Sequence, residues 1–196
     1  MKIIWLLALG YVAFCNIVPE DNEMAAVERP EVVEEETPTT NGMYTLEIDY
    51  LGGDGHDIEL ARNQSAINPT YDQMIEFIRT DKTDRNEYIP DQYVCGDFAE
   101  DVQNNAEAMG YNCAWVYIEF EDGIAHACNA FDTTDRGLVF IDCTRSIGDG
   151  PTNQDCIVNV ADDEEYTQRF IKGSDYKPVS MGIVENYEVI WDGDLW

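Results

Sequence analysis

Positive charge and histidine are the scarcest features of this chain. Its 196 residues carry 11 lysines and arginines against 40 acidic residues, a formal net charge of −29. A surface this acidic repels phosphate groups, which excludes nucleic acid and anionic membrane surfaces as partners. Only two histidines are present, His56 and His126. An imidazole general base therefore has few possible identities in this protein.

A long hydrophobic run is also missing. The stretch over residues 3–14 is shorter than the about 20 residues that cross a bilayer. It follows Lys2 and leads into Ala13-Phe14-Cys15, a small-x-small sequence, which predicts a secretion signal over residues 1–15. A lipid anchor on Cys15 and an uncleaved membrane anchor are the alternatives. Each version predicts a secreted or cell-surface protein.

The remainder divides into a linker and one domain. Residues 16–42 are rich in glutamate, contain three prolines and show no sustained hydrophobic period, which predicts a solvated linker. Residues 43–196 predict an α+β domain, with an antiparallel sheet and helices packed on one face. We expect strands at 43–50, 113–120, 124–131, 138–143, 157–160, 166–171 and 187–191. We expect helices starting at the N-cap Thr70 and at Cys95, the second ending near Gly110.

Three residue types needed for thiol catalysis occur in order along the domain. Cys95 opens a helix, whose N–H groups favour a thiolate and an oxyanion, and Gly96 and Gln92 are candidates for the oxyanion site. His126 lies on the predicted strand at 124–131. Asp142 lies on the following predicted strand and interrupts its apolar run, L-V-F-I-D-C-T. A carboxylate there would orient the imidazole. A buried or disulfide-bonded cysteine and a structural histidine are the alternatives.

Strand parity gives a test of the histidine–aspartate pair. The positions of His126 and Asp142 have an even sum, whereas those of Cys128 and Cys143 have an odd sum. A regular hairpin can therefore place either the first pair or the second pair on one face, but not both.

The cysteine count sets a rival interpretation. Without Cys15, five cysteines remain, so four could form two disulfides and leave one free thiol, which we expect to be Cys95. A zinc site is the other use of clustered cysteines, but the spacing lacks the short pairs of zinc ligands at Cys113, Cys128, Cys143 and His126. The turn G-G-D-G-H that contains His56 lacks the ligand spacing of a calcium loop. The sequence therefore predicts no metal and no cofactor.

Several segments resemble the transglutaminase-like superfamily of thiol enzymes, specifically a group of secreted prokaryotic proteins with that fold. They are N-P-T-Y-D-Q-M-I-E-F, Y-V-C-G-D-F-A and H-A-C-N-A-F-D-T-T-D-R-G-L-V-F-I-D-C-T, within residues 66–144. The resemblance implies Cys95 as nucleophile, His126 as base and Asp142 as its partner. It implies attack on an amide or acyl group of a peptide or protein, by hydrolysis or acyl transfer. The alternative is a non-catalytic extracellular binding or cell-envelope module of the same fold.

Overall fold

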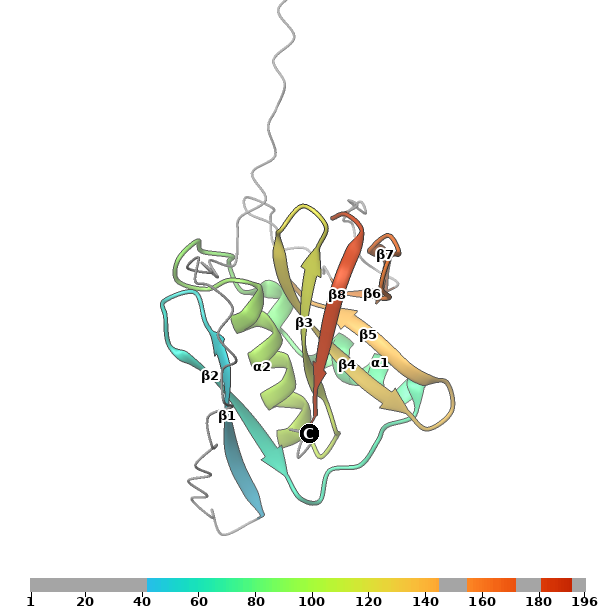
Figure 1. The fold of residues 1–196 in the computed structure, drawn as a ribbon. Helices are drawn as coiled ribbons and strands as arrows, with labels where there is room; N and C mark the ends of the chain where they lie inside the picture. Colours follow the sequence, from blue (N-terminus) through green and yellow to red (C-terminus); the bar gives the residue numbers. More distant parts are fainter. Residues whose placement is uncertain (1–41, 145–154, 172–180, 192–196) are drawn as a thin grey trace, which may run out of the picture.

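The computed structural model describes residues 42–144, 155–171 and 181–191. The predicted signal at 1–15 and nearly all of the predicted linker at 16–42 lie outside these residues. None of the described helices is both long and apolar enough to cross a membrane. The described residues form an α+β structure, which confirms the predicted class (Figure 1).

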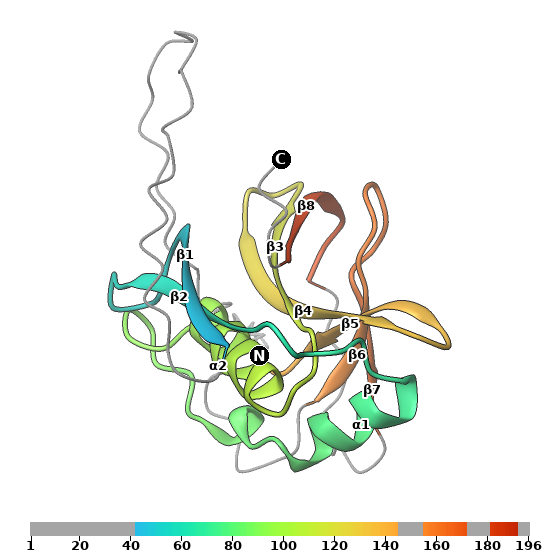
Figure 2. The same cartoon turned by 90° about the horizontal axis from the view of Figure 1, so that it is seen from below.

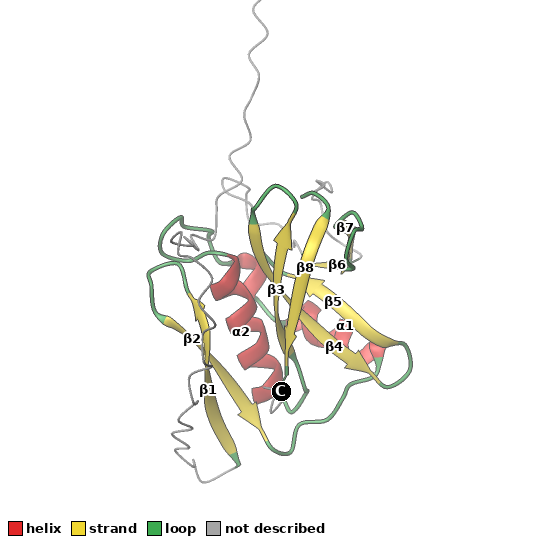
Figure 3. Cartoon of the chain, in the orientation of Figure 1, coloured by secondary structure: helices red, strands yellow, loops and turns green. Residues whose placement is uncertain are grey.

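A six-stranded antiparallel sheet forms the larger part of the fold, in the order β7-β6-β5-β4-β3-β8 (Figure 3). Consecutive strands pair from β3 to β7, as the short connections predicted, and β8 returns to pair with β3. The segments that lead into the two edge strands are also joined, because the Tyr166 N–H donates to the Gly182 carbonyl at 2.9 Å. The strand bounds are β3 Ala114–Phe120, β4 Ala125–Thr133, β5 Gly137–Asp142, β6 Cys156–Asn159, β7 Thr167–Phe170 and β8 Val184–Ile190.

Two helices cover one face of this sheet, as predicted (Figure 2). Helix α1 spans Tyr71–Thr80, and Thr70 caps it in a reciprocal arrangement with Gln73. Helix α2 spans Cys95–Ala108 and is followed by Gly110 at φ +85°, the left-handed backbone that favours glycine. The short 3₁₀ helix η1, Thr83–Arg85, lies between them.

The sheet has a different apolar cluster on each face. Even-numbered residues of β3 and β4, such as Val116 and Cys128, pack with Tyr166 away from the helices. Odd-numbered residues face the helices: Phe131 packs with residues of α1, while Trp115 and Ala127 pack beside the first turn of α2. This alternation decides which side chains can meet.

A separate hairpin covers the other side of α2. Strand β1, Met43–Leu51, was predicted, whereas its partner β2, Asp57–Asn63, was not. The N–H groups at the outer edge of β2 donate to side chains of α2 at every second residue, namely Glu59, Ala61 and Asn63. The Glu59 N–H donates to Glu100 at 2.9 Å, and the Asn63 N–H donates to Glu107 at 3.0 Å. Helix side chains thus satisfy a strand edge that would otherwise lack partners.

Candidate functional site

Cys95 is the first residue of α2 and its side chain is buried. It packs in one cluster with Trp115 and Ala127, and the Trp115 indole N–H donates to the Gly96 carbonyl at 3.2 Å. Asp97 fixes the start of the helix, because its Oδ2 accepts the Val94 N–H at 2.8 Å. The helix start is therefore held by both a side-chain cap and a tryptophan contact.

The prediction that Cys95 is the free thiol and that the other four cysteines form two disulfides is wrong. Cys95 is disulfide-bonded, whereas Cys113, Cys128, Cys143 and Cys156 are free. These five are all the cysteines among the described residues. Since a disulfide sulfur is not a nucleophile, Cys95 needs reduction before it can act as one.

The sheet explains why the four free cysteines do not pair. Cys113 and Cys143 lie on the helix-covered face, and Cys128 and Cys156 lie on the opposite face. Within each face the two cysteines are separated by an intervening strand, a spacing of at least roughly 9–10 Å, which exceeds the reach of a disulfide. Burial raises the pKa of all four thiols, so they behave as apolar core residues.

His126 and Asp142 form the pair that strand parity allowed. The register pairs Asn129 with Ile141, whose positions have an even sum, so His126 and Asp142 share a face. Their side chains are hydrogen-bonded at 3.0 Å between Nε2 and Oδ2, and both residues are buried. The same register separates Cys128 from Cys143.

Tyr166 completes this buried group, and the sequence had given it no role. Its hydroxyl donates to Asp142 Oδ2 at 2.7 Å, and its ring lies edge-on to the His126 ring. Burial alone would raise the pKa of Asp142, but the His126 charge, together with hydrogen bonds from His126, the Thr144 N–H and Tyr166, lowers it. Burial, with the neighbouring Asp142 charge, raises the pKa of Tyr166 well above its usual value. The group is therefore a neutral tyrosine on an ionised carboxylate.

The structure brings together two of the three predicted catalytic residues. His126 and Asp142 face the cluster around Tyr166, whereas Ala127, the next residue of β4, faces α2 and packs with Cys95. The backbone of β4 thus lies between the Cys95 sulfur and the His126 ring. His126 is the second residue of β4, so this separation occurs at the end of the strand.

The two oxyanion candidates flank the start of α2. Gly96 is buried, and a Cβ added to it would contact Ile58, Leu51 and Trp115 at 3.7–3.9 Å. The Cα of Gly96 thus faces the protein interior and not an approaching substrate. Gln92 is exposed in the turn before α2, and its backbone is covered by Gly53. Their oxyanion role stays a prediction.

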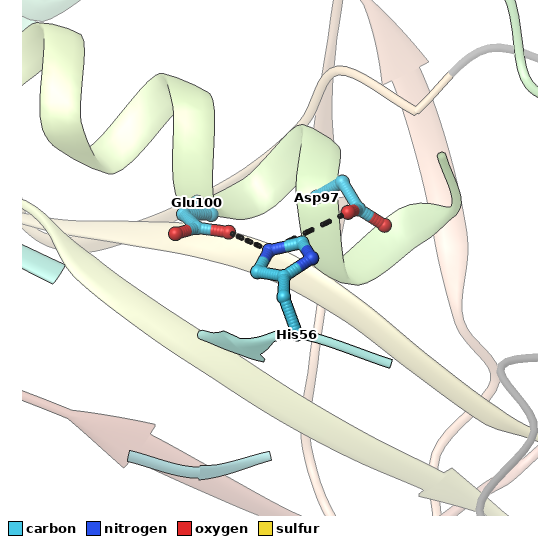
Figure 4. Close-up of side chains that lie close together, drawn as sticks. All are labelled: His56, Asp97 and Glu100. Atoms are coloured by element: carbon cyan, nitrogen blue, oxygen red, sulfur yellow. Dashed lines mark hydrogen bonds and ion pairs between the residues drawn. The ribbon is translucent and has the colours of Figure 1, made fainter. Parts of the chain in front are cut away.

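A second polar cluster lies on the outer side of α2. His56, from the turn between β1 and β2, points its Nε2 toward Glu100 Oε2 at 3.1 Å and Asp97 Oδ1 at 3.8 Å (Figure 4). A hydrogen bond to Asp54 and, with burial opposing, further contacts to Glu100 raise the pKa of His56 to about 9. These three side chains could hold a metal ion. The sequence had given no sign of it, because His56 and the two carboxylates are far apart in the chain.

Comparison with known proteins adds no family. A scan of protein-family models found no match to this chain, and searches of curated proteins and of solved structures found none. The transglutaminase-like resemblance stays a prediction that rests on the sequence motifs.

Proposed function

We propose that this protein is a secreted or surface-tethered thiol enzyme that acts on amide or acyl bonds of peptides or proteins after reduction of Cys95. The observation that carries the proposal is the buried hydrogen bond between His126 and Asp142, closed by Tyr166. A lone carboxylate in an apolar strand is costly, so its retention beside an imidazole favours a role in orienting that ring.

The position of Cys95 supplies the second support. It opens a helix of 14 residues, where unpaired N–H groups stabilise negative charge on the sulfur and on an attacked carbonyl. It also packs against Ala127, the residue next to His126. The thiol and the imidazole lie on opposite sides of β4, near the first residues of that strand.

The reaction begins with thiol–disulfide exchange, in which a dithiol reductant gives two electrons and two protons to the Cys95 disulfide, forming two thiols, and is itself oxidised to a disulfide. Cys95 then gives its proton to His126 and attacks the carbonyl carbon of an amide. As the C–N bond breaks, His126 protonates the leaving amine, and a thioester forms. Water or a second amine then releases the acyl group and restores the thiol. For contact with His126, the sulfur must pass around the end of β4.

The test compares alkylation rates of the reduced protein. We expect iodoacetamide to modify Cys95 rapidly in the wild type and more slowly, by about tenfold or more, in His126→Ala, because the imidazole no longer accepts the thiol proton. Peptide mapping by mass spectrometry assigns the label to Cys95. Glu119→Gln, which removes a charge from the neighbouring strand without touching the pair, is the control and should react as the wild type does.

Equal and slow rates in the wild type and His126→Ala would contradict the proposal. A screen of glutamine-containing peptides then separates the two outcomes of catalysis. Ammonia release without an added amine indicates hydrolysis, whereas incorporation of an added primary amine indicates acyl transfer.

A non-catalytic extracellular binding module is the second candidate. The disulfide at Cys95 favours it, because a permanent disulfide would keep the sulfur unreactive. In that case the pair of His126 and Asp142 stabilises the sheet and has no chemical task. This candidate expects Cys95 to resist mild reduction and reduced Cys95 to alkylate slowly.

A further inference from the structure

The cluster around His56 combines one imidazole and two carboxylates from two separate elements. His56 comes from the turn after β1, and Asp97 and Glu100 lie three residues apart on one face of α2, in its first two turns. One ligand atom from each of the three lies within 4.8 Å of the others. Figure 4 shows the His56 ring between the two carboxylates.

Each of the three side chains has two polar atoms. One is hydrogen-bonded to a residue outside the cluster, and the other points toward the remaining two side chains. Asp97 Oδ2 accepts the N–H groups of Gly53 at 2.9 Å and Val94 at 2.8 Å. Glu100 Oε1 accepts the Glu59 N–H at 2.9 Å. His56 Nδ1 is hydrogen-bonded to Asp54, an arrangement that commonly orients metal-binding histidines.

Asp97 has an oxygen without a hydrogen-bond donor. Its side chain is 4% exposed, and among the described residues Oδ1 has only the 3.8 Å contact with His56 Nε2, too long for a hydrogen bond. This oxygen therefore has no partner at hydrogen-bond distance among the described residues, and a cation between it and the imidazole would supply one.

The turn is shaped to let these groups approach. A Cβ on Gly52 would lie 2.1 Å from the His56 ring and 2.7 Å from Asp97 Oδ1, so no other residue fits here without moving them. His56 itself is 42% exposed, which leaves one side of the cluster open to solvent.

We propose that His56 Nε2, Asp97 Oδ1 and Glu100 Oε2 bind a divalent first-row transition metal ion such as Zn²⁺. One imidazole and two carboxylates suit these ions, and three protein ligands leave a further position for water. Ca²⁺ and Mg²⁺ fit less well, because they prefer oxygen ligands and this cluster offers a nitrogen. Two carboxylates beside the imidazole supply the negative charge that a divalent cation needs.

Metal binding would join the turn between β1 and β2 to the first two turns of α2. The ligand Asp97 lies two residues after Cys95, so the ion would fix the segment that carries the cysteine. This inference does not depend on the proposed thiol chemistry.

The test is titration of the metal-free, full-length protein with Zn²⁺, followed by calorimetry, and with Co²⁺, followed by its visible absorption. We expect one ion per chain, with affinity reduced about tenfold or more in His56→Gln and in Glu100→Gln. Both variants keep the Asp97 cap, so they keep the start of α2. The Co²⁺ spectrum should lose its imidazole-dependent bands in His56→Gln alone.

Glu59→Gln is the matched control. Glu59 is exposed on β2 beside the cluster, and only its backbone N–H takes part in it. This variant removes one carboxylate and should bind Zn²⁺ as the wild type does. Several weak ions per chain, equal in all four proteins, would show that Zn²⁺ binds only to the acidic surface and would overturn the proposal. Tighter binding of Mg²⁺ than of Zn²⁺ would overturn it as well.

Discussion

The hydrogen bond from Tyr166 to Asp142 allows a quantitative test of the buried group. Tyr166→Phe removes only the hydroxyl, because the ring keeps its edge-on contacts with Phe120 and His126. Tyr166 is 0% exposed, and its acceptor is an ionised carboxylate at 2.7 Å. Hydrogen bonds to charged groups contribute about 1.5–3 kcal/mol, so we expect the free energy of unfolding to fall by about 2 kcal/mol at pH 7.

The same variant should respond differently to acid. The pKa of Asp142 is lowered in the folded state. Its stabilisation is therefore present above the unfolded pKa of about 3.9 and is lost as pH falls through the folded value. Because the Tyr166 hydroxyl is one cause of the lowered pKa, the Asp142 carboxylate contributes less stabilisation in Tyr166→Phe, and acid removes less of it. The difference between wild type and variant should shrink as pH falls below about 4.

Urea unfolding followed by tryptophan fluorescence, without reductant, measures both effects. Tyr187→Phe is the control, since Tyr187 is half-buried and its hydroxyl makes no hydrogen bond among the described residues. We expect the control to change the free energy of unfolding by less than about 0.5 kcal/mol. A Tyr166→Phe loss no larger than that of Tyr187→Phe, or a difference independent of pH, would refute the reasoning.

The core and the turn give two further predictions. Burial raises the pKa of the free thiols, so their stabilisation is present below the unfolded thiol pKa and is lost as pH rises above it. Urea unfolding at pH 8 and pH 10 should therefore show lower stability at pH 10, and Cys128→Ala should weaken that dependence by up to about 1.4 kcal/mol per pH unit. Gly53→Ala should lower the melting temperature, because its Cβ would lie 2.8 Å from the Gln92 backbone. Gly96→Ala should leave it unchanged or raise it, since its Cβ finds ordinary contacts and alanine favours the helix by up to about 1 kcal/mol. A higher melting temperature for Gly53→Ala, or a lower one for Gly96→Ala, in thermal unfolding would contradict the described turn.

Periodicity and turn chemistry were enough to predict most of the sheet and both helices. The short glycine-ended connections predicted the meander from β3 to β5, and Thr70 predicted the start of α1. Strand β2 was missed although Ile58 and Leu60 alternate with charged residues, because that alternation is short and its next buried position is the charged Arg62. Its stability comes from α2, whose side chains bind its outer backbone groups, and this contact is not local in the sequence.

The pairing of His126 with Asp142 could be predicted from strand parity, whereas the candidate metal site could not be predicted from the sequence. The register of a regular hairpin has one of two parities, and each parity places a different pair of these residues on one face. The cluster of His56, Asp97 and Glu100 depends instead on how a hairpin packs on a helix. Its only local signal is the run of glycines before His56, which indicates a turn and not a ligand site.

The face on which α2 packs was the decisive unknown for the catalytic prediction. Asn129 donates to the Ala99 carbonyl at 2.8 Å and so attaches α2 to the odd-numbered face of β4. Residues an odd number apart in a regular strand point to opposite faces, so His126, three residues earlier, points away from that helix. A helix attached through Asn129 therefore brings its cysteine to His126 only around the end of β4. The alkylation test with His126→Ala thus examines whether reduced Cys95 makes that contact, because no regular continuation of the strand permits it.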